Sequence, residues 1–274
     1  MNNLKTFLMT LPTTLLLIGC GGGGTNNTTG MTYKNIRIEH DNNNDGAIDI
    51  NQTFVHNNLC QLTQENYDNN MDGVIDNKTT LIYDNNNLLI LKKVDNDNDG
   101  NTDFTHSYSY NNNNQLIQVI IDNTNTTTDY TYDSNGNQIS KRFDLNGNNL
   151  IVNLTTWIYN NSNLKISTNI DQNNDGVIDK IVTHSYDSNN NLIKDEMNNI
   201  NFIGDTVIDQ IITRSYDNNN HLISVNNDNN ANGNINSKIT YTYDNNGNLK
   251  TTNYDFTNDG TIDKVEYYYW EVYP

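Results

Sequence analysis

The segment DQNNDGVIDKIVTHSYD, residues 171–187, contains the two patterns that decide the fold. Its first nine residues place Asp or Asn at alternate positions around Gly176, and the rest alternates apolar and hydroxyl side chains. Ile178, Val182 and Tyr186 fall on one face of a strand, because successive side chains of a strand point to opposite faces. The segment therefore predicts an oxygen-rich loop that leads into a β-strand.

The same loop recurs along the chain. Copies begin at Asp41, Asp68 and Asp171, with close variants at Asp95 and Asp255, and neighbouring copies tend to begin about 27 residues apart. Alignment on these loops gives nine units. They begin near Asp41, Asp68, Asp95, Asp122, Asp144, Asp171, Asn201, Asp228 and Asp255. We therefore expect residues 33–274 to form a single array.

Each unit contains two strands and two reversals of the chain. The first strand ends in a turn rich in Asp, Asn and Gly, such as 133–136 or 217–220, because these residues accept positive φ. A second strand, such as 88–94, 116–121 or 164–170, leads to the next acidic loop. We expect an all-β fold of tandem β-hairpins. About 18 strands would make an open sheet too wide, so the long antiparallel sheet is expected to be curled or spiralling.

Short segments resemble the YD repeat of the RHS family. These are YTYDSNGN at 130–137, YTYDNNGNL at 241–249 and SYD at 215–217. The resemblance covers most of the array and implies a spiralling β-sheet that encloses a toxin or forms an extracellular stalk. No Asp-Pro core signature of the toxin-bearing members is found in this sequence, and no cargo domain follows Trp270. The sequence therefore favours a structural module over a toxin carrier.

The acidic loop also resembles the calcium-binding hairpin of integrin α-chain propeller repeats, of the FG-GAP type. That resemblance implies that the side chains at loop positions 1, 3, 5 and 9 bind Ca²⁺, with Gly at position 6 for the sharp bend. An EF-hand needs Glu at position 12, where Gln52, Thr79 and Val182 stand instead. The expected ligands are Asp41, Asn43, Asp45, Asp49, Asp68, Asn70, Asp72, Asp76, Asp95, Asp97, Asp99, Asp103, Asp171, Asn173, Asp175, Asp179, Asp255, Thr257, Asp259 and Asp263.

The other four units depart from this pattern. The loop of Asp228 has one carboxylate and predicts a weak site. Val152 takes position 9 after Asp144, Ile203 takes position 3 after Asn201, and the loop that begins at Asp122 has no glycine, so these three predict turns without metal. For every loop the alternative stays open that Asp, Asn and Gly form a tight hairpin without an ion.

Residues 1–19 resemble a bacterial lipoprotein signal peptide, with an apolar stretch over 7–18 and a lipobox-like sequence that ends at Cys20. The resemblance implies lipidation of Cys20, with residues 20–32 as a flexible tether. Gly21 after the cysteine implies the outer membrane or cell surface. Because lipid would occupy Cys20, no disulfide with Cys60 is expected.

The net charge of −18 argues against a nucleic-acid partner. The histidines lack a paired nucleophile motif, so no enzyme is expected. An aromatic column can bind glycan rings if exposed, or pack a core. It comprises Tyr108, Tyr110, Trp157, Tyr159, Tyr241, Tyr243, Tyr268 and Trp270. We expect a surface-tethered, calcium-binding structural or adhesive lipoprotein with a glycan or protein ligand; the alternative is an accessory or remnant of an RHS-type polymorphic toxin system.

Overall fold

The computed structural model describes residues 32–148, 150–200 and 204–273. The expected signal peptide and almost all of the expected tether, with Cys20, lie outside these ranges. No helix in the described part of the chain is long and apolar enough to cross a membrane.

Eighteen strands account for most of the described residues. They are β1 (Thr32–Asp41), β2 (Ile50–His56), β3 (Leu62–Asp68), β4 (Asn77–Tyr83), β5 (Leu89–Asp95), β6 (Phe104–Tyr110), β7 (Leu116–Ile121), β8 (Thr126–Tyr132), β9 (Gln138–Asp144), β10 (Ile151–Tyr159), β11 (Lys165–Asp171), β12 (Lys180–Tyr186), β13 (Leu192–Asn199), β14 (Gln210–Tyr216), β15 (Leu222–Asp228), β16 (Ser237–Tyr243), β17 (Leu249–Asp255) and β18 (Lys264–Tyr273).

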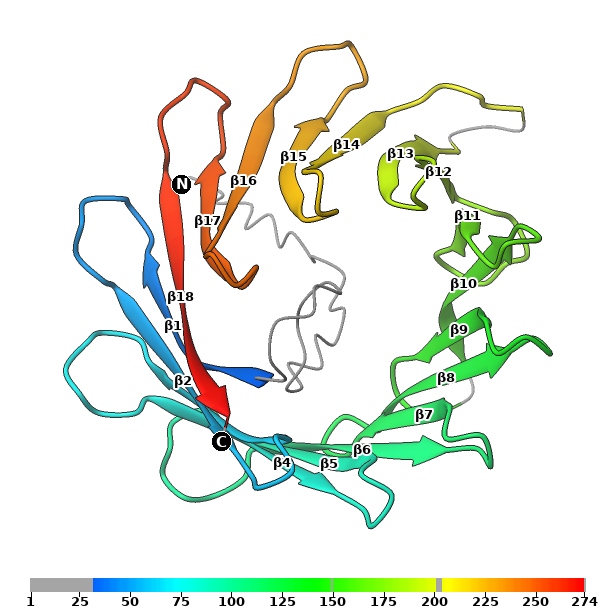
Figure 1. Cartoon of the computed structure of the whole chain (residues 1–274). Helices are drawn as coiled ribbons and strands as arrows, with labels where there is room; N and C mark the ends of the chain where they lie inside the picture. The colour runs from blue at the N-terminus through cyan, green and yellow to red at the C-terminus, as the bar shows by residue number, and fades with distance from the viewer. Residues whose placement is uncertain (1–31, 149, 201–203, 274) are drawn as a thin grey trace, which may run out of the picture.

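The strands form one closed antiparallel barrel. Each strand pairs with the next along the chain, and β18 pairs with β1 from Thr32 opposite Tyr273 to Asp41 opposite Val265 (Figure 1). The all-β fold of tandem hairpins is confirmed, but the expected curled or spiralling sheet is wrong. Closure lets the two outermost strands satisfy each other's backbone groups, which an open sheet would leave unpaired.

Antiparallel order places the connections at two ends of the barrel. The loop rim comprises the connections that follow odd-numbered strands, and it holds all the acidic loops. The turn rim comprises the short connections that follow even-numbered strands: 57–61, 84–88, 111–115, 133–137, 160–164, 187–191, 217–221 and 244–248. The two kinds of Asp- and Asn-rich segment are thus separated by the length of a strand.

The recurring Tyr-Asp dipeptide has two structural roles at the turn rim. The hydroxyl of Tyr83 donates to the carbonyl of Leu62 on the preceding strand at 2.8 Å, and Asp84 Oδ1 accepts the backbone N–H groups of Asn86 and Leu88, both at 2.8 Å. The same tyrosine bond recurs around the barrel. It is made by Tyr110, Tyr132, Tyr159, Tyr186, Tyr216 and Tyr243, and by the indole N–H of Trp270.

These bonds assign the aromatic column to the barrel wall. Four of its members, Tyr110, Tyr159, Tyr243 and Trp270, hold their polar ends on backbone carbonyls. Burial raises the pKa of Tyr108 to about 12, as expected for a hydroxyl partly removed from water. At least these four side chains therefore have a structural role in the barrel wall.

Candidate metal sites

The most buried side chains of the barrel are carboxylates at the loop rim. Asp41 and Asp171 are 1% and 2% exposed, and both end an odd strand as position 1 of an acidic loop. Burial of a charge is costly unless hydrogen bonds compensate it. The Asp41 carboxylate accepts the N–H groups of Asp45 at 3.1 Å and Gly46 at 2.9 Å. The loop thus folds back over its first carboxylate.

Two further carboxylates complete this loop. Asp49 Oδ2 accepts the N–H of Asn42 at 2.8 Å, and Asp45 Oδ1 accepts the N–H of Ala47 at 2.8 Å. Gly46 has φ +88, a conformation that side chains disfavour, which explains the glycine at position 6. The backbone thus fixes the carboxylates at positions 1, 5 and 9.

Equivalent hydrogen bonds form in the other four predicted loops. In each, the position 9 carboxylate accepts from the N–H of position 2, and position 1 accepts from the N–H of glycine. The acceptors at position 9 are Asp76, Asp103, Asp179 and Asp263. The acceptors at position 1 are Asp68, Asp95, Asp171 and Asp255. All five predicted ligand sets therefore lie in one backbone frame, and metal binding by them stays a prediction.

The loop of Asp228 has the same frame with fewer charges. Asp228 accepts from the N–H of Gly233 at 2.7 Å, while the amide oxygen of Asn236 replaces the position 9 carboxylate and accepts from Asn229 N at 2.6 Å. Backbone geometry therefore does not separate the loops predicted to bind metal strongly from the one predicted to bind it weakly. Only the charge of the side chains does.

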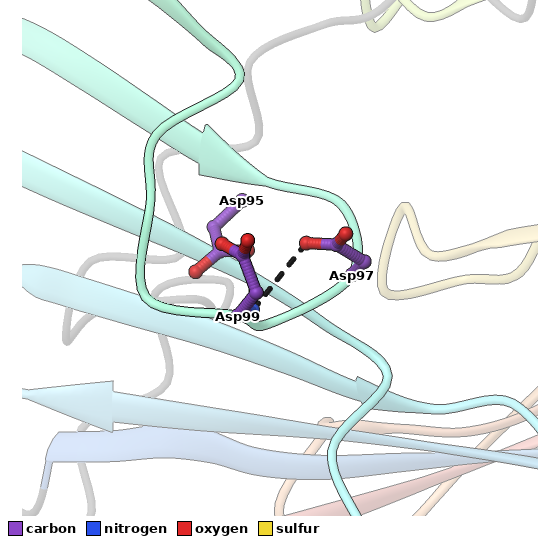
Figure 2. A group of neighbouring side chains, drawn as sticks. All are labelled: Asp95, Asp97 and Asp99. Atoms are coloured by element: carbon purple, nitrogen blue, oxygen red, sulfur yellow. Dashed lines mark hydrogen bonds between the residues drawn. The ribbon is translucent and has the colours of Figure 1, made fainter.

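The loop after β5 brings three carboxylates close together. Asp95, Asp97 and Asp99 each offer an oxygen within 4.8 Å of the others. Figure 2 shows Asp97 facing the other two across the loop, with Asp99 N donating to its Oδ1 at 3.3 Å. Hydrogen bonds from Asn101 hold the pKa of Asp99 below its usual value, which keeps it ionised. Adjacent negative charges repel one another, and a hard cation would relieve that repulsion.

Asp68 provides a test of fit for such a cation. It is 5% exposed, and its Oδ2 accepts the N–H of Gly73 at 3.0 Å. Its Oδ1 is buried and has no hydrogen-bond partner in the described part of the chain. A buried carboxylate oxygen without a donor suits a cation that binds oxygen, and the donor set of the loop consists of oxygen atoms alone, as Ca²⁺ prefers.

Two of the units predicted to lack metal form connections of other kinds. The connection after β7 is a short turn, in which Asp122 accepts the hydroxyl of Thr105. Asp144 is buried and accepts the N–H of Asn146 at 3.1 Å, but Val152 stands where position 9 would supply a carboxylate. Neither connection gathers several carboxylates.

The seventh unit begins at Asn198, three residues before Asn201, where alignment of the sequence placed its start. Asp209 N donates to Met197 O at 2.8 Å, as Asp49 N donates to His40 O at 2.8 Å in the first loop. Position 1 is therefore Asn198, and the assignment to Asn201 is wrong. Ile203, which the sequence alignment placed at position 3 of this loop, lies outside the described ranges. The cause is a stretched loop, which moves the glycine out of its usual place.

Neighbouring loops are linked through position 4. Asn98 Nδ2 donates to the carbonyl of Ile75, at position 8 of the preceding loop, at 3.0 Å. Asn258 and Asn44 make the same bond to Ile235 and Ile262 at 3.2 Å and 2.9 Å, the latter across the closure of the barrel. These links join acidic loops side by side around the rim.

A polar cluster on the barrel wall was not expected from the sequence. His184 Nδ1 and Asp195 Oδ1 lie 2.6 Å apart, Arg214 donates to Asp195 Oδ2 at 2.7 Å, and Thr168 Oγ1 lies 2.9 Å from His184 Nε2. The cluster joins β11, β12, β13 and β14. It gives His184 a cross-strand pairing role, and its members are too far apart in sequence for a local motif to reveal them.

Cys60 occupies a turn position where most other units have Asn or Gly, with φ 61. It is 8% exposed and disulfide-bonded. The sequence predicted no disulfide, because lipid would occupy the only other cysteine, and this prediction is wrong. The state of Cys60 therefore bears directly on the lipid anchor.

No family model and no curated protein matches the chain. A crystal structure of TcdB2-TccC3-Cdc42 is similar over 80% of this chain and 13% of that chain, with 15% identity and a TM-score of 0.41. A porin-like protein from Bacteroides uniformis is similar over 90% of this chain and 100% of that chain, with 14% identity and a TM-score of 0.49. Likenesses of this strength support no function.

Proposed function

We propose that this chain is a non-enzymatic, calcium-binding repeat lipoprotein that acts as a structural or adhesive module at the bacterial outer membrane or cell surface. The observation that carries the proposal is the repeated loop frame. Its first carboxylate is buried in four of the five loops, Asp95 excepted, and Asp68 has a buried oxygen without a hydrogen-bond donor among the described residues. Ca²⁺ would add positive charge at one rim of a protein with net charge −18. Loop closure and charge balance would then stiffen the barrel.

The residues that would hold Ca²⁺ are those at positions 1, 3, 5 and 9 of the five acidic loops. Thr257 is the weakest of these, because a neutral hydroxyl replaces the carboxylate or amide found in the other loops. Extracellular modules typically bind Ca²⁺ with dissociation constants of about 0.1 to 1 mM. Such sites suit a structural ion outside the cell, where calcium is continuously available.

We also propose that the repeats of this chain are of the RHS family's YD type. This assignment is supported by the role of the Tyr-Asp dipeptide, which caps a strand carbonyl with Tyr and folds a turn with Asp in unit after unit. The same observation favours the second candidate, an accessory of an RHS-type toxin system. Binding of a glycan or matrix surface by the purified protein supports the adhesive role; binding of a cargo protein in its place supports the accessory role.

Elemental analysis of the purified full chain tests the calcium sites. After equilibration with about 1 mM CaCl₂, in the range typical of extracellular sites, we expect several bound Ca²⁺ ions per chain. Asp76→Asn and Asp103→Asn should each weaken one site, because each removes a position 9 carboxylate. Asp84→Asn at the turn rim is the matched control and should leave the metal content unchanged. A chain that retains no calcium would disprove the proposal.

Mass spectrometry of the protein from a bacterial membrane fraction tests the anchor. We expect cleavage before Cys20 and a lipid mass on its sulfur. A lipid thioether and a disulfide cannot share one sulfur atom. A non-reduced digest in which the peptides of Cys20 and Cys60 remain joined would therefore exclude lipidation at that sulfur and remove the tether from the proposal.

A further inference from the structure

The stretched connection between β13 and β14 has the same closing bonds as the acidic loops. Asn199 N donates to Asp209 Oδ2 at 2.6 Å, and Asp209 N donates to Met197 O at 2.8 Å. The equivalent pair of bonds closes the loops after β1, β3, β5, β11 and β17. Asp209 therefore takes position 9, and Asn198, at the end of β13, takes position 1.

Asn198 presents a buried oxygen that lacks a donor. Its side chain is part of a residue 8% exposed, and its Nδ2 donates to the carbonyl of Asp205 at 3.0 Å, which fixes the orientation of the amide. Its Oδ1 is buried and has no hydrogen-bond partner among the described residues. A buried acceptor of this kind destabilises the fold unless a donor or a cation satisfies it.

The loop also supplies two carboxylates, which take positions 5 and 9 of the frame. Asp205 is 8% exposed, and its Oδ1 accepts the N–H of Val207 at 3.0 Å. This bond matches the one that Asp45 Oδ1 accepts from Ala47 at 2.8 Å, so Asp205 takes position 5. With Asp209 at position 9, the loop has two negative charges and a neutral amide oxygen, all of them hard ligands.

We propose that Asn198, Asp205 and Asp209 form a further divalent cation site, of the Ca²⁺ class, in a loop whose sequence pattern predicts none. The inference extends the proposed calcium binding to a sixth loop. Two carboxylates balance the charge of one divalent ion. The site is weaker than the loop of Asp95, which has four carboxylates, because affinity rises with the number of charged ligands.

Calcium titration of the full chain tests the site, with elemental analysis to count bound ions. Asp209→Asn should remove one Ca²⁺ from the count. Asn198→Asp supplies the side chain that the other loops have at position 1, and it should tighten one site about tenfold through the added charge. Asp84→Asn is the control, and circular dichroism in chelator checks that each variant retains the barrel.

The outcomes separate this inference from the proposed function. A wild-type chain that binds no calcium overturns both. A wild-type chain that binds calcium, with the count unchanged in Asp209→Asn and the affinities unchanged in Asn198→Asp, overturns the sixth site alone. If Asp209→Asn fails to fold, Asn198→Asp decides: a tighter site supports the inference, and unchanged affinities overturn it.

Discussion

The two rims of the barrel use Asp and Asn for different purposes. At the turn rim one side-chain oxygen accepts two backbone N–H groups, and Asn57, Asn111 and Asn160 do this as well as Asp84 does. A neutral acceptor is therefore sufficient there. At the loop rim several oxygens gather in one loop, and some, such as Asp68 Oδ1, have no hydrogen-bond donor in the part of the chain that the structure describes. Hydrogen bonding to the backbone explains the Asp and Asn residues of the turn rim. The negative charge of its carboxylates distinguishes the loop rim.

Calcium removal should lower the thermal stability more than any of the substitutions below. It should act only through the acidic loops of the loop rim. Each site stabilises the native state by about 1.4 to 2.7 kcal/mol when Ca²⁺ exceeds its dissociation constant ten- to hundredfold. Five sites together should shift the melting temperature strongly, as measured by calorimetry in excess Ca²⁺ and in chelator. Asp84→Asn should preserve that shift, whereas Asp76→Asn should reduce it. Equal melting temperatures in the two buffers would contradict the contrast between the rims.

Loss of a turn-rim acceptor should have a smaller effect that calcium does not change. Asp84→Ala removes the acceptor for Asn86 N and Leu88 N, and should lower the free energy of unfolding by about 1 to 2 kcal/mol. Urea denaturation with and without Ca²⁺ measures the change. Asp84→Asn keeps the acceptor and should lie within about 0.5 kcal/mol of wild type. A calcium-dependent loss in Asp84→Ala would show that the two rims are coupled.

Alkaline titration should expose the tyrosine bonds beside the turn rim. Burial raises the pKa of Tyr243 to about 12, above the value near 10 of an unfolded tyrosine. The protonated Tyr243 hydroxyl therefore contributes fully to the free energy of unfolding below about pH 10, and this contribution is lost as the pH rises through about 12. Tyr243→Phe loses the bond to Leu222 O and should be about 1 kcal/mol less stable at pH 8. Urea midpoints at pH 8 and 11 should show that deficit shrinking; a constant deficit would contradict the raised pKa.

The smallest change in stability should come from adding a position 4 hydrogen bond between two neighbouring loops that lack it. Met71 occupies position 4 of its loop with φ 59, where Asn44 and Asn98 bond to a neighbouring loop. Met71→Asn should relieve the left-handed strain and donate to the carbonyl of Ile48, for a gain of about 1 kcal/mol. Asn98→Ala, the reverse change, should lose a similar amount. Thermal unfolding measures both, and a destabilised Met71→Asn would argue against the link.

The sequence predicted the strands well, because each carries its own alternating pattern and its own turn. The expected strand 116–121 coincides with β7, and 164–170 differs from β11 by one residue at each end. Closure could not be predicted, since the pairing of β1 with β18 joins residues more than 200 positions apart and depends on accumulated twist. Period-2 patterns show which residues share a face, but they do not fix how far the sheet bends.

The loops show the same division between local and distant information. Those that keep glycine at position 6 fold in the predicted frame, because the positive φ of that residue sets the bend. The insertion after β13 breaks that spacing, so the role of Asn198 emerges only from its hydrogen bonds. Likewise Arg214 and His184 belong to different units, and only strand pairing brings both to Asp195.

Closure of the barrel also means that the array has no unique first strand. Thr32 and Tyr273 are opposite one another at the end of the β1 and β18 ladder, where every other pair of this kind is joined by a turn. A short Asp-Asn-Gly connector there would supply a ninth turn, and the chain could then be opened at any of the existing eight. Circular permutants made in this way should enclose the same barrel, with the polypeptide ends moved to a chosen point on its circumference.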